Sequence, residues 1–164
     1  MKNIYLGWIA YNNDPYRWVP DKSKWSGADD RFVRGEQGKR KIGPTLSFFR
    51  ESEYAGNIHK ALLLAQPDEH SKEIVKLLQK ELPDEAIEPV EREVESIIDH
   101  NELLQIMQEF VADVVSRYKE EQVRFLVNIS PGPPAAQVIW MILTQAGRGL
   151  FDPHEMRVYQ GVPP

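Results

Sequence analysis

Short apolar runs separated by turn-forming residues recur along this chain. The segments 4–10, 59–65 and 123–129 are mostly apolar. They predict buried strands, because strands that are covered on both faces lose the alternation of polar and apolar positions. Two shorter segments, 86–90 and 156–160, predict further strands of the same kind.

Helical periods lie between these predicted strands. Apolar positions recur every three or four residues over 68–82 and again over about 102–118, which predicts two amphipathic helices. Asp68 is of a residue type that caps helix N-termini. Segment 133–146 predicts a third helix, and segment 44–54, which begins with a proline suited to a first turn, predicts a fourth.

The alternation of strands and helices predicts the fold class. We expect an α/β protein, a Rossmann-like three-layer domain whose mainly parallel sheet is covered on both faces. A length of 164 residues fits one domain, which we place over 1–164. Because Gly161–Pro164 has the composition of a linker, we expect this domain to be the N-terminal part of a longer effector.

Residues 14–43 have no sustained period and are rich in charges and glycines. The segment is either a hairpin or an ordered loop, and so long an interruption is more often functional than a plain connector. Trp18 and Trp25 could stack on a nucleobase, pack at a dimer contact or fill the core. The basic run Lys39-Arg40-Lys41 either lines the phosphates of a ligand or is a solvated charge run.

Composition and charge exclude several classes of function. The chain has 20 Lys and Arg against 25 Asp and Glu, a net charge of -5, which argues against a protein that coats duplex DNA. It has no cysteine, which excludes disulfides, cysteine-ligated zinc and thiol catalysis. The four histidines show no paired spacing, so we expect no metal and no cofactor. The first apolar run is too short for a signal sequence or a membrane span, so we expect a cytoplasmic protein.

The loop 128–134, Asn-Ile-Ser-Pro-Gly-Pro-Pro, carries the candidate chemistry. It connects a predicted strand to a predicted helix, and ligands of open α/β sheets bind outside the carboxyl ends of the strands. The first amides of the helix are unpaired and carry the positive end of its dipole, which favours an anion. Gly132 has no Cβ to hold a ligand away from the backbone. We therefore expect valine at this position to abolish ligand binding with little effect on thermal unfolding.

A purely structural interpretation of the same loop remains open. Ser, Pro and Gly between a strand and a helix can serve only to turn and cap the chain. The sequence contains neither GxGxxG nor GxxxxGK[ST], so it has neither a dinucleotide fingerprint nor a P-loop.

The segment 125–143, FLVNISPGPPAAQVIWMIL, resembles the strand–loop–helix of CARF domains, the CRISPR-associated Rossmann-fold sensors. It is most similar to the branch found in RNA-repair transcription activators and in related CRISPR effectors such as CARF–adenosine deaminase fusions. Segment 43–47 is similar to the proline-threonine segment of that branch, segment 59–64 to its second strand and segment 137–140 to its helix.

This resemblance implies a homodimer that binds a cyclic oligoadenylate, such as cyclic tetra- or hexa-adenylate, and allosterically regulates a fused C-terminal effector in type III CRISPR antiviral defence. The effector could be a deaminase, a nuclease or an AAA+ activator. The domain itself is expected to have no catalytic residues, no membrane partner and no duplex DNA partner. Residues and resemblance together give the candidate ligand-binding set: Tyr11, Asn12, Asn13, Lys41, Thr45, Asn128, Ser130, Pro131, Gly132, Pro133 and Gln137.

One departure from the family pattern leaves alternatives open. The family commonly has Gly-Thr where this chain has Gly132-Pro133, so a threonine hydroxyl is missing and neither ring size nor ring cleavage carries over. The chain could instead be a stand-alone ring nuclease, in which Ser130 and Lys41 help to position the ribose hydroxyl and stabilise developing charge. It could also be a sensor of RNA ends for a transcription activator.

Overall fold

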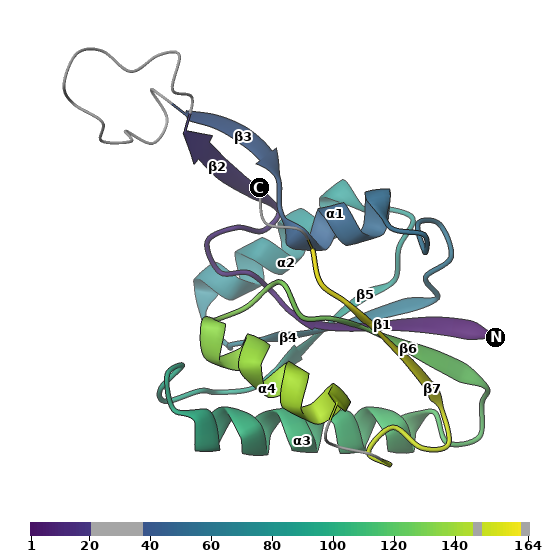
Figure 1. Cartoon of the computed structure of the whole chain (residues 1–164). Coiled ribbons are helices and arrows are strands. Elements are labelled where there is room, and N and C mark those ends of the chain that lie inside the picture. Colours follow the sequence, from purple (N-terminus) through teal and green to yellow (C-terminus); the bar gives the residue numbers. More distant parts are fainter. Residues whose placement is uncertain (21–37, 146–148, 162–164) are drawn as a thin grey trace.

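Five parallel strands form the central sheet of the protein. The computed structural model describes residues 1–20, 38–145 and 149–161 of the chain. The strands are β1 (Lys2–Trp8), β4 (Lys60–Ala65), β5 (Ile87–Glu91), β6 (Val123–Asn128) and β7 (Glu155–Tyr159), in the order β5-β4-β1-β6-β7 (Figure 1). Every neighbouring pair runs parallel, and each of the five strands coincides closely with a segment predicted from the sequence.

Helices cover both faces of this sheet. They are α1 (Pro44–Glu51), α2 (Glu69–Glu81), α3 (His100–Arg117) and α4 (Pro134–Gln145). The helices α1 and α2 pack on one face, and α3 and α4 pack on the other (Figure 1). The predicted Rossmann-like three-layer α/β fold is therefore confirmed.

Capping residues determine where the two longest helices begin. The carboxylate of Asp68 accepts a hydrogen bond of 2.7 Å from the amide of Ser71 and caps α2 as predicted. Asp99 accepts from the amides of Asn101 and Glu102 and caps α3. The start of α3 at His100, slightly before the predicted one, follows from this cap, because the apolar period alone marks only the first turn that packs on the core.

Two apolar cores lie on either side of the sheet, and the central strand β1 contributes to both. Ile4 and Leu6 belong to the core beneath α3 and α4, whereas Tyr5 faces α1 and α2. All three are fully buried, which explains why this strand is apolar without alternation. Trp140 of α4 is also fully buried and belongs to the core beneath α3 and α4.

A two-stranded antiparallel hairpin is inserted between β1 and α1. Its strands are β2 (Tyr16–Pro20) and β3 (Gly38–Ile42), with Arg17 paired to Lys41. The hairpin projects away from the sheet (Figure 1). Of the two interpretations of segment 14–43, the hairpin is thus correct for its described part. Trp25 lies outside the described residues, and only the backbone of Trp18 is described.

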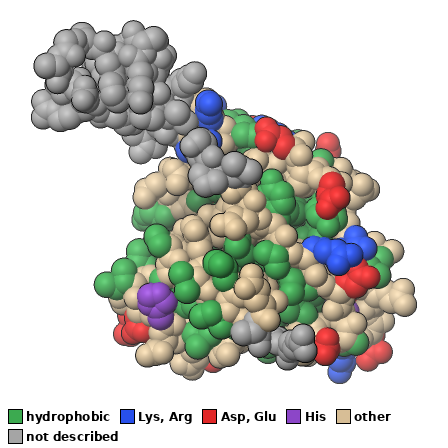
Figure 2. All heavy atoms as spheres, viewed as in Figure 1, with side chains coloured by type: hydrophobic (Ala, Val, Ile, Leu, Met, Phe, Trp, Pro, Cys, Tyr) green, Lys and Arg blue, Asp and Glu red, His purple; other side chains and the backbone are tan. Residues whose placement is uncertain are grey.

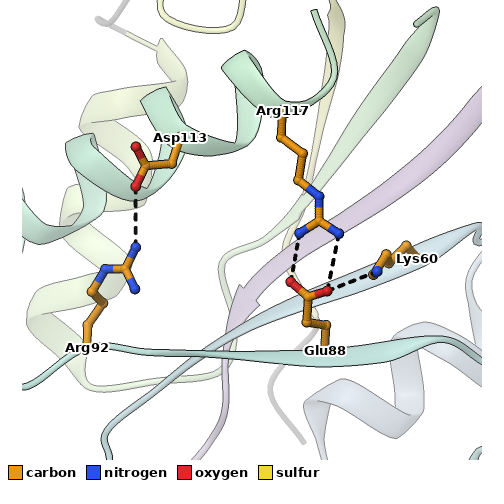
Figure 3. Close-up of polar contacts among 5 residues, drawn as sticks. All are labelled: Lys60, Glu88, Arg92, Asp113 and Arg117. Atoms are coloured by element: carbon orange, nitrogen blue, oxygen red, sulfur yellow. Dashed lines mark hydrogen bonds and ion pairs between the residues drawn. The ribbon is translucent and has the colours of Figure 1, made fainter.

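Ion pairs join α3 to the edge of the sheet (Figure 3). The carboxylate of Glu88 on β5 accepts from Arg117 at 2.7 and 3.2 Å and lies 2.9 Å from the ammonium of Lys60. Hydrogen bonds from Arg117 are the main reason that the pKa of Glu88 falls to about 2. Nearby, Arg92 pairs with Asp113 at 3.3 Å.

Within the described residues no helix is long and apolar enough to cross a membrane.

Candidate functional site

The strand order creates a switch point between β1 and β6. From β1 the chain proceeds to β4 and β5 on one side, and later to β6 and β7 on the other. The segments that leave β1 and β6 therefore diverge at the carboxyl edge, the position at which open α/β sheets bind ligands. Residues 9–14 follow β1 and residues 129–133 follow β6, so both predicted binding segments reach this edge.

A cavity of about 600 Å³ opens at the switch point, and we name it the crevice cavity. It extends across the carboxyl ends of β4, β1 and β6 and reaches the segment before α3. Its floor is apolar and its rim is polar. The lining residues are Trp8, Ile9, Ala10, Tyr11, Asn12, Asn13, Gln66, Asp68, Ser71, Val94, Ile97, Leu103, Gly132, Pro133, Pro134 and Gln137.

A second cavity, of about 570 Å³, lies where the hairpin joins the domain, and we name it the hairpin cavity. It extends across the carboxyl ends of β6 and β7 and the base of the hairpin. Asn13 and Gln137 line both cavities. The lining residues are Asn13, Arg17, Lys41, Ile42, Gly43, Pro44, Ser47, Glu51, Ser130, Gln137, Tyr159, Gln160 and Gly161.

Eight of the eleven predicted site residues thus line one or both cavities, and the other three are buried. Thr45 and Asn128 are fully buried, and Pro131 is buried in the loop between β6 and α4. The sequence could not distinguish residues that line a cavity from residues buried behind its wall, because all three lie in segments that reach the site. Their side chains support the walls of the cavities from below.

Thr45 belongs to a buried polar cluster around Asp14. Its hydroxyl donates to the Asp14 carboxylate at 2.7 Å and its amide donates at 3.3 Å, while the amide of Ala10 donates at 2.8 Å. Burial raises the pKa of Asp14 to about 6 in spite of these bonds. Because Asp14 joins the segment after β1 to the start of α1, it holds the hairpin base against the crevice.

Asn128 and Gln137 hold the loop that follows β6. Asn128 donates to the Tyr5 hydroxyl at 3.0 Å and accepts from the amide of Ser130 at 3.2 Å. Gln137 donates to the carbonyls of Ser130 and Gly132, at 3.0 and 3.4 Å. With its amide nitrogen committed in this way, Gln137 forms the partition between the two cavities.

Gly132 is required by the fold itself, which corrects the role predicted from the sequence. Its φ of +102° is rarely adopted by residues with a side chain, and a Cβ built there would lie 2.8 Å from Cβ of Trp8. The expectation that valine would spare thermal stability is therefore wrong. The glycine allows the loop to pack on the end of β1, in addition to lining the cavity.

The start of α4 offers fewer free amides than the sequence predicted. Pro133 and Pro134 have no amide hydrogen. The amide of Ser130 donates to Asn128, and the amides of Ala136 and Gln137 donate to the carbonyl of Pro133. An anion at this edge would therefore need side-chain donors as well as the backbone.

Two lining residues that the sequence did not single out carry buried polar atoms without a partner. Nε1 of Trp8 and Oγ of Ser71 make no hydrogen bond within the described part of the chain. Both side chains line the crevice cavity. Applying the carboxyl-end rule to β4 as well as to β1 and β6 would have pointed to the segment that holds Ser71.

Metal ligation finds no support in the geometry. Among the residues described, no group of three or more His, Asp and Glu side chains lies close enough to hold an ion. The two cavities offer a ligand apolar surface, hydrogen-bonding groups and the positive charges of the hairpin, beside the carboxylates of Asp68 and Glu51.

Comparison with known proteins gives a match among solved structures. No family model and no curated protein matches this sequence. Among solved structures the chain is similar to Csm6 of Enterococcus italicus, solved bound to cyclic hexa-2'-fluoro-hexa-dAMP, with a TM-score of 0.63 and 14% sequence identity. The match covers 99% of this chain and 34% of Csm6, so the chain spans about a third of that protein's length. The likeness shows the fold: this chain has a Rossmann-like α/β fold similar to that of part of Csm6.

Proposed function

We propose that this chain is a sensor domain that binds a cyclic oligoadenylate in CRISPR-based defence. The observation that carries the proposal is the crevice cavity of about 600 Å³ at the switch point. It lies between the two segments that the resemblance assigns to ligand binding, in a fold shared with a protein solved in complex with a cyclic hexanucleotide analogue. The candidate contact residues at this cavity are Tyr11, Asn12, Asn13, Gly132, Pro133 and Gln137.

The composition of the crevice cavity suits a nucleoside. Ile9 and Leu103 give it an apolar floor, while Asn12 and Asn13 place amide groups at the rim. Such a combination of apolar surface and few polar groups is typical of small-molecule sites. Tyr11 is half exposed, and its ring centroid lies 4.2 Å from that of His70. This pair offers an aromatic surface on which a base can stack.

We further propose that the sensor acts as a homodimer through α4. On the outer side of this helix Val138, Met141 and Ile142 are 46%, 42% and 48% exposed, and Figure 2 shows hydrophobic side chains spread over this front face. Because α4 begins at the loop that lines both cavities, a dimer formed through it would bring two copies of that loop near one ligand. A ligand with two-fold symmetry fits this arrangement.

Signal transfer to a fused effector would use the segment after β7. The amide of Gly161 donates to the hydroxyl of Ser130 at 2.5 Å, so the chain that leaves β7 is joined directly to the candidate binding loop. A ligand that shifts this loop would move the outgoing chain. In this proposal the complete protein acts in the cytoplasm, where a cyclic oligoadenylate signal would be made.

Isothermal titration calorimetry with cyclic tetra- and hexa-adenylate tests the proposal. We expect saturable binding of one ring per two chains, and light scattering should give the mass of a dimer. Ile142→Glu should yield a monomer with weakened binding. Absence of binding by both rings would contradict the proposal.

Two further reagents separate the alternatives. Preference for linear RNA with a 2',3'-cyclic phosphate, with steep salt dependence, would favour a sensor of RNA ends. Linear fragments that accumulate over minutes, resolved by chromatography, would identify a ring nuclease.

A further inference from the structure

Two cations face each other across the base of the hairpin. Arg17 and Lys41 are directly paired in the register of β2 and β3, so their side chains project from the same face of the hairpin. Both line the hairpin cavity. Like charges in directly opposed positions destabilise a strand pair, and neither residue forms an ion pair with any residue that the structure describes. The arrangement is suited to holding a negative charge.

The other walls of the cavity offer hydrogen bonds around these charges. The hydroxyl-bearing residues Ser47, Ser130 and Tyr159 belong to its lining. One carboxylate, that of Glu51, also belongs to the described lining, where it accepts from the Ser47 hydroxyl at 3.2 Å. Two positive charges and one negative charge leave the cavity with a positive excess. Figure 2 shows basic side chains where the hairpin meets the domain.

The base of the hairpin is held rigidly in place. The amide of Gly43 donates to the carbonyl of Pro15 at 2.8 Å, and Nε of Arg17 donates to the carbonyl of Ile42 at 3.4 Å. A Cβ at Gly43 would overlap the carbonyl oxygen of Asn13, so the hairpin packs directly on the segment that lines the crevice cavity. Binding a ligand here would therefore cost little ordering of the backbone.

We propose that the hairpin cavity is a phosphate subsite, with Arg17 and Lys41 as its charged ligands. A guanidinium whose Nε is already engaged presents its terminal nitrogens as a fork, which matches two phosphate oxygens, and an ammonium adds a mobile point charge. The identity of the ligand rests on the proposed function. In that case the subsite holds a phosphate of a nucleotide whose base occupies the crevice cavity. Asn13 and Gln137, shared by the two cavities, lie between base and phosphate.

The first test compares Arg17→Gln/Lys41→Gln with the wild type in titrations of cyclic hexa-adenylate over a range of salt concentrations. We expect affinity to fall at least about tenfold at low salt, because two charge-assisted contacts are lost. The slope of log affinity against log salt should flatten by roughly 1.4 for two phosphate contacts on a single strand. Lys76→Gln/Lys119→Gln removes the same charge away from the cavity and should change neither quantity by a comparable amount.

A second measurement does not depend on the proposed ligand. Addition of inorganic pyrophosphate should shift the amide NMR signals of Ser130 and Gly161 and the side-chain Nε signal of Arg17. The double variant should lose the shifts at Ser130 and Gly161. Its unfolding midpoint without ligand should stay equal or rise, since a like-charge pair has been removed, and this excludes misfolding as the cause.

The outcomes distinguish the two proposals from each other. If cyclic hexa-adenylate fails to bind but pyrophosphate produces the expected shifts, the phosphate subsite stands and the proposed nucleotide is wrong. If the double variant binds cyclic hexa-adenylate with unchanged affinity and salt slope, the subsite is overturned while the proposed function stands. Equal pyrophosphate shifts in the wild type and the double variant would also overturn it.

Discussion

The crevice cavity and the hairpin cavity lie at the same edge of the sheet but are lined by different structural elements. The crevice cavity is bounded by the ends of buried strands, and its floor includes core residues such as Trp8 and Leu103. The hairpin cavity is bounded by an inserted hairpin and by the chain that leaves β7, and it carries Arg17 and Lys41. The first follows from the sheet topology itself, whereas the second depends on an insertion.

This contrast separates two kinds of recognition. Contacts with an apolar floor depend on buried area and change little with salt. Attraction by partly exposed charges is screened over about 8 Å at physiological ionic strength. Ligand contacts in the two cavities should therefore respond differently to the same change in salt concentration, and variants confined to one cavity can test this.

Substitution of Gly132 should have the largest effect on stability, because this residue lies where the end of β1 packs on the loop between β6 and α4. Gly132→Ala should lower the free energy of unfolding by about 4 kcal/mol, the sum of a strained positive φ and overlap with Trp8. Urea unfolding measures the loss. Gly56→Ala is a matched control: Gly56 has a φ of +78° but nothing within 4 Å of its Cβ position, so only the backbone cost of about 1 kcal/mol is expected. Equal losses at the two positions would show that contact with Trp8 is unimportant.

Asp14 should make the free energy of unfolding depend on pH, because its carboxyl group is buried between the two cavities. Burial raises its pKa from the ordinary value of 3.8 to about 6 in the folded chain, so the folded state binds more protons than the unfolded state between these values. The stabilisation is complete below about pH 4 and is lost as the pH rises through 6, a difference on the order of 3 kcal/mol. Urea unfolding at pH 3 and 7.5 measures it. Asp14→Asn should remove this part of the slope, and an unchanged slope in that variant would assign the effect to other groups.

Ser71 should show whether the crevice cavity uses its unpartnered hydroxyl for the ligand. Ser71→Ala should leave the free energy of unfolding unchanged or raise it by up to about 1 kcal/mol, because a buried hydroxyl without a partner is removed. Affinity for cyclic hexa-adenylate should fall about fivefold, and the salt slope should stay that of the wild type. A lower slope would mean that the two cavities do not divide recognition as proposed.

Glu88 should have the smallest effect, because its ion pairs lie on the surface and away from both cavities. Glu88→Gln should cost at most about 1 kcal/mol in the free energy of unfolding. Ligand affinity measured by calorimetry should not change. A clear loss of affinity would show that the contact between α3 and the edge strand, and not the carboxyl edge alone, controls the site.

The local patterns of the sequence were sufficient for the elements of the fold. Buried strands such as β1 and β6 are recognisable because their apolar runs follow directly from burial on both faces. Asp68 marked the start of α2 because a cap needs only its own neighbours. The hairpin was one of two interpretations, since the sequence of residues 14–43 has no sustained period that would indicate strands.

For the candidate site, the sequence predicted only the edge of the sheet at which it lies. The rule that ligands bind at carboxyl ends brought Asn13 and Gln137 to the correct edge, and both line the two cavities. It could not show that Thr45 and Asn128 are buried, because their burial depends on contacts with distant segments. It also missed Trp8 and Ser71, whose place in the wall depends on how β1 and α2 pack.

By itself the sequence determined the succession of strands and helices, the α/β class and the loop at which the chain turns from β6 to α4, because each depends on neighbours along the chain. Tertiary structure alone decided which residues of that loop face a cavity, why position 132 must be glycine and that Arg17 stands opposite Lys41. The physical reason is the same in each case. Close packing joins residues far apart in the chain, and no local pattern records which side chain will occupy the neighbouring space.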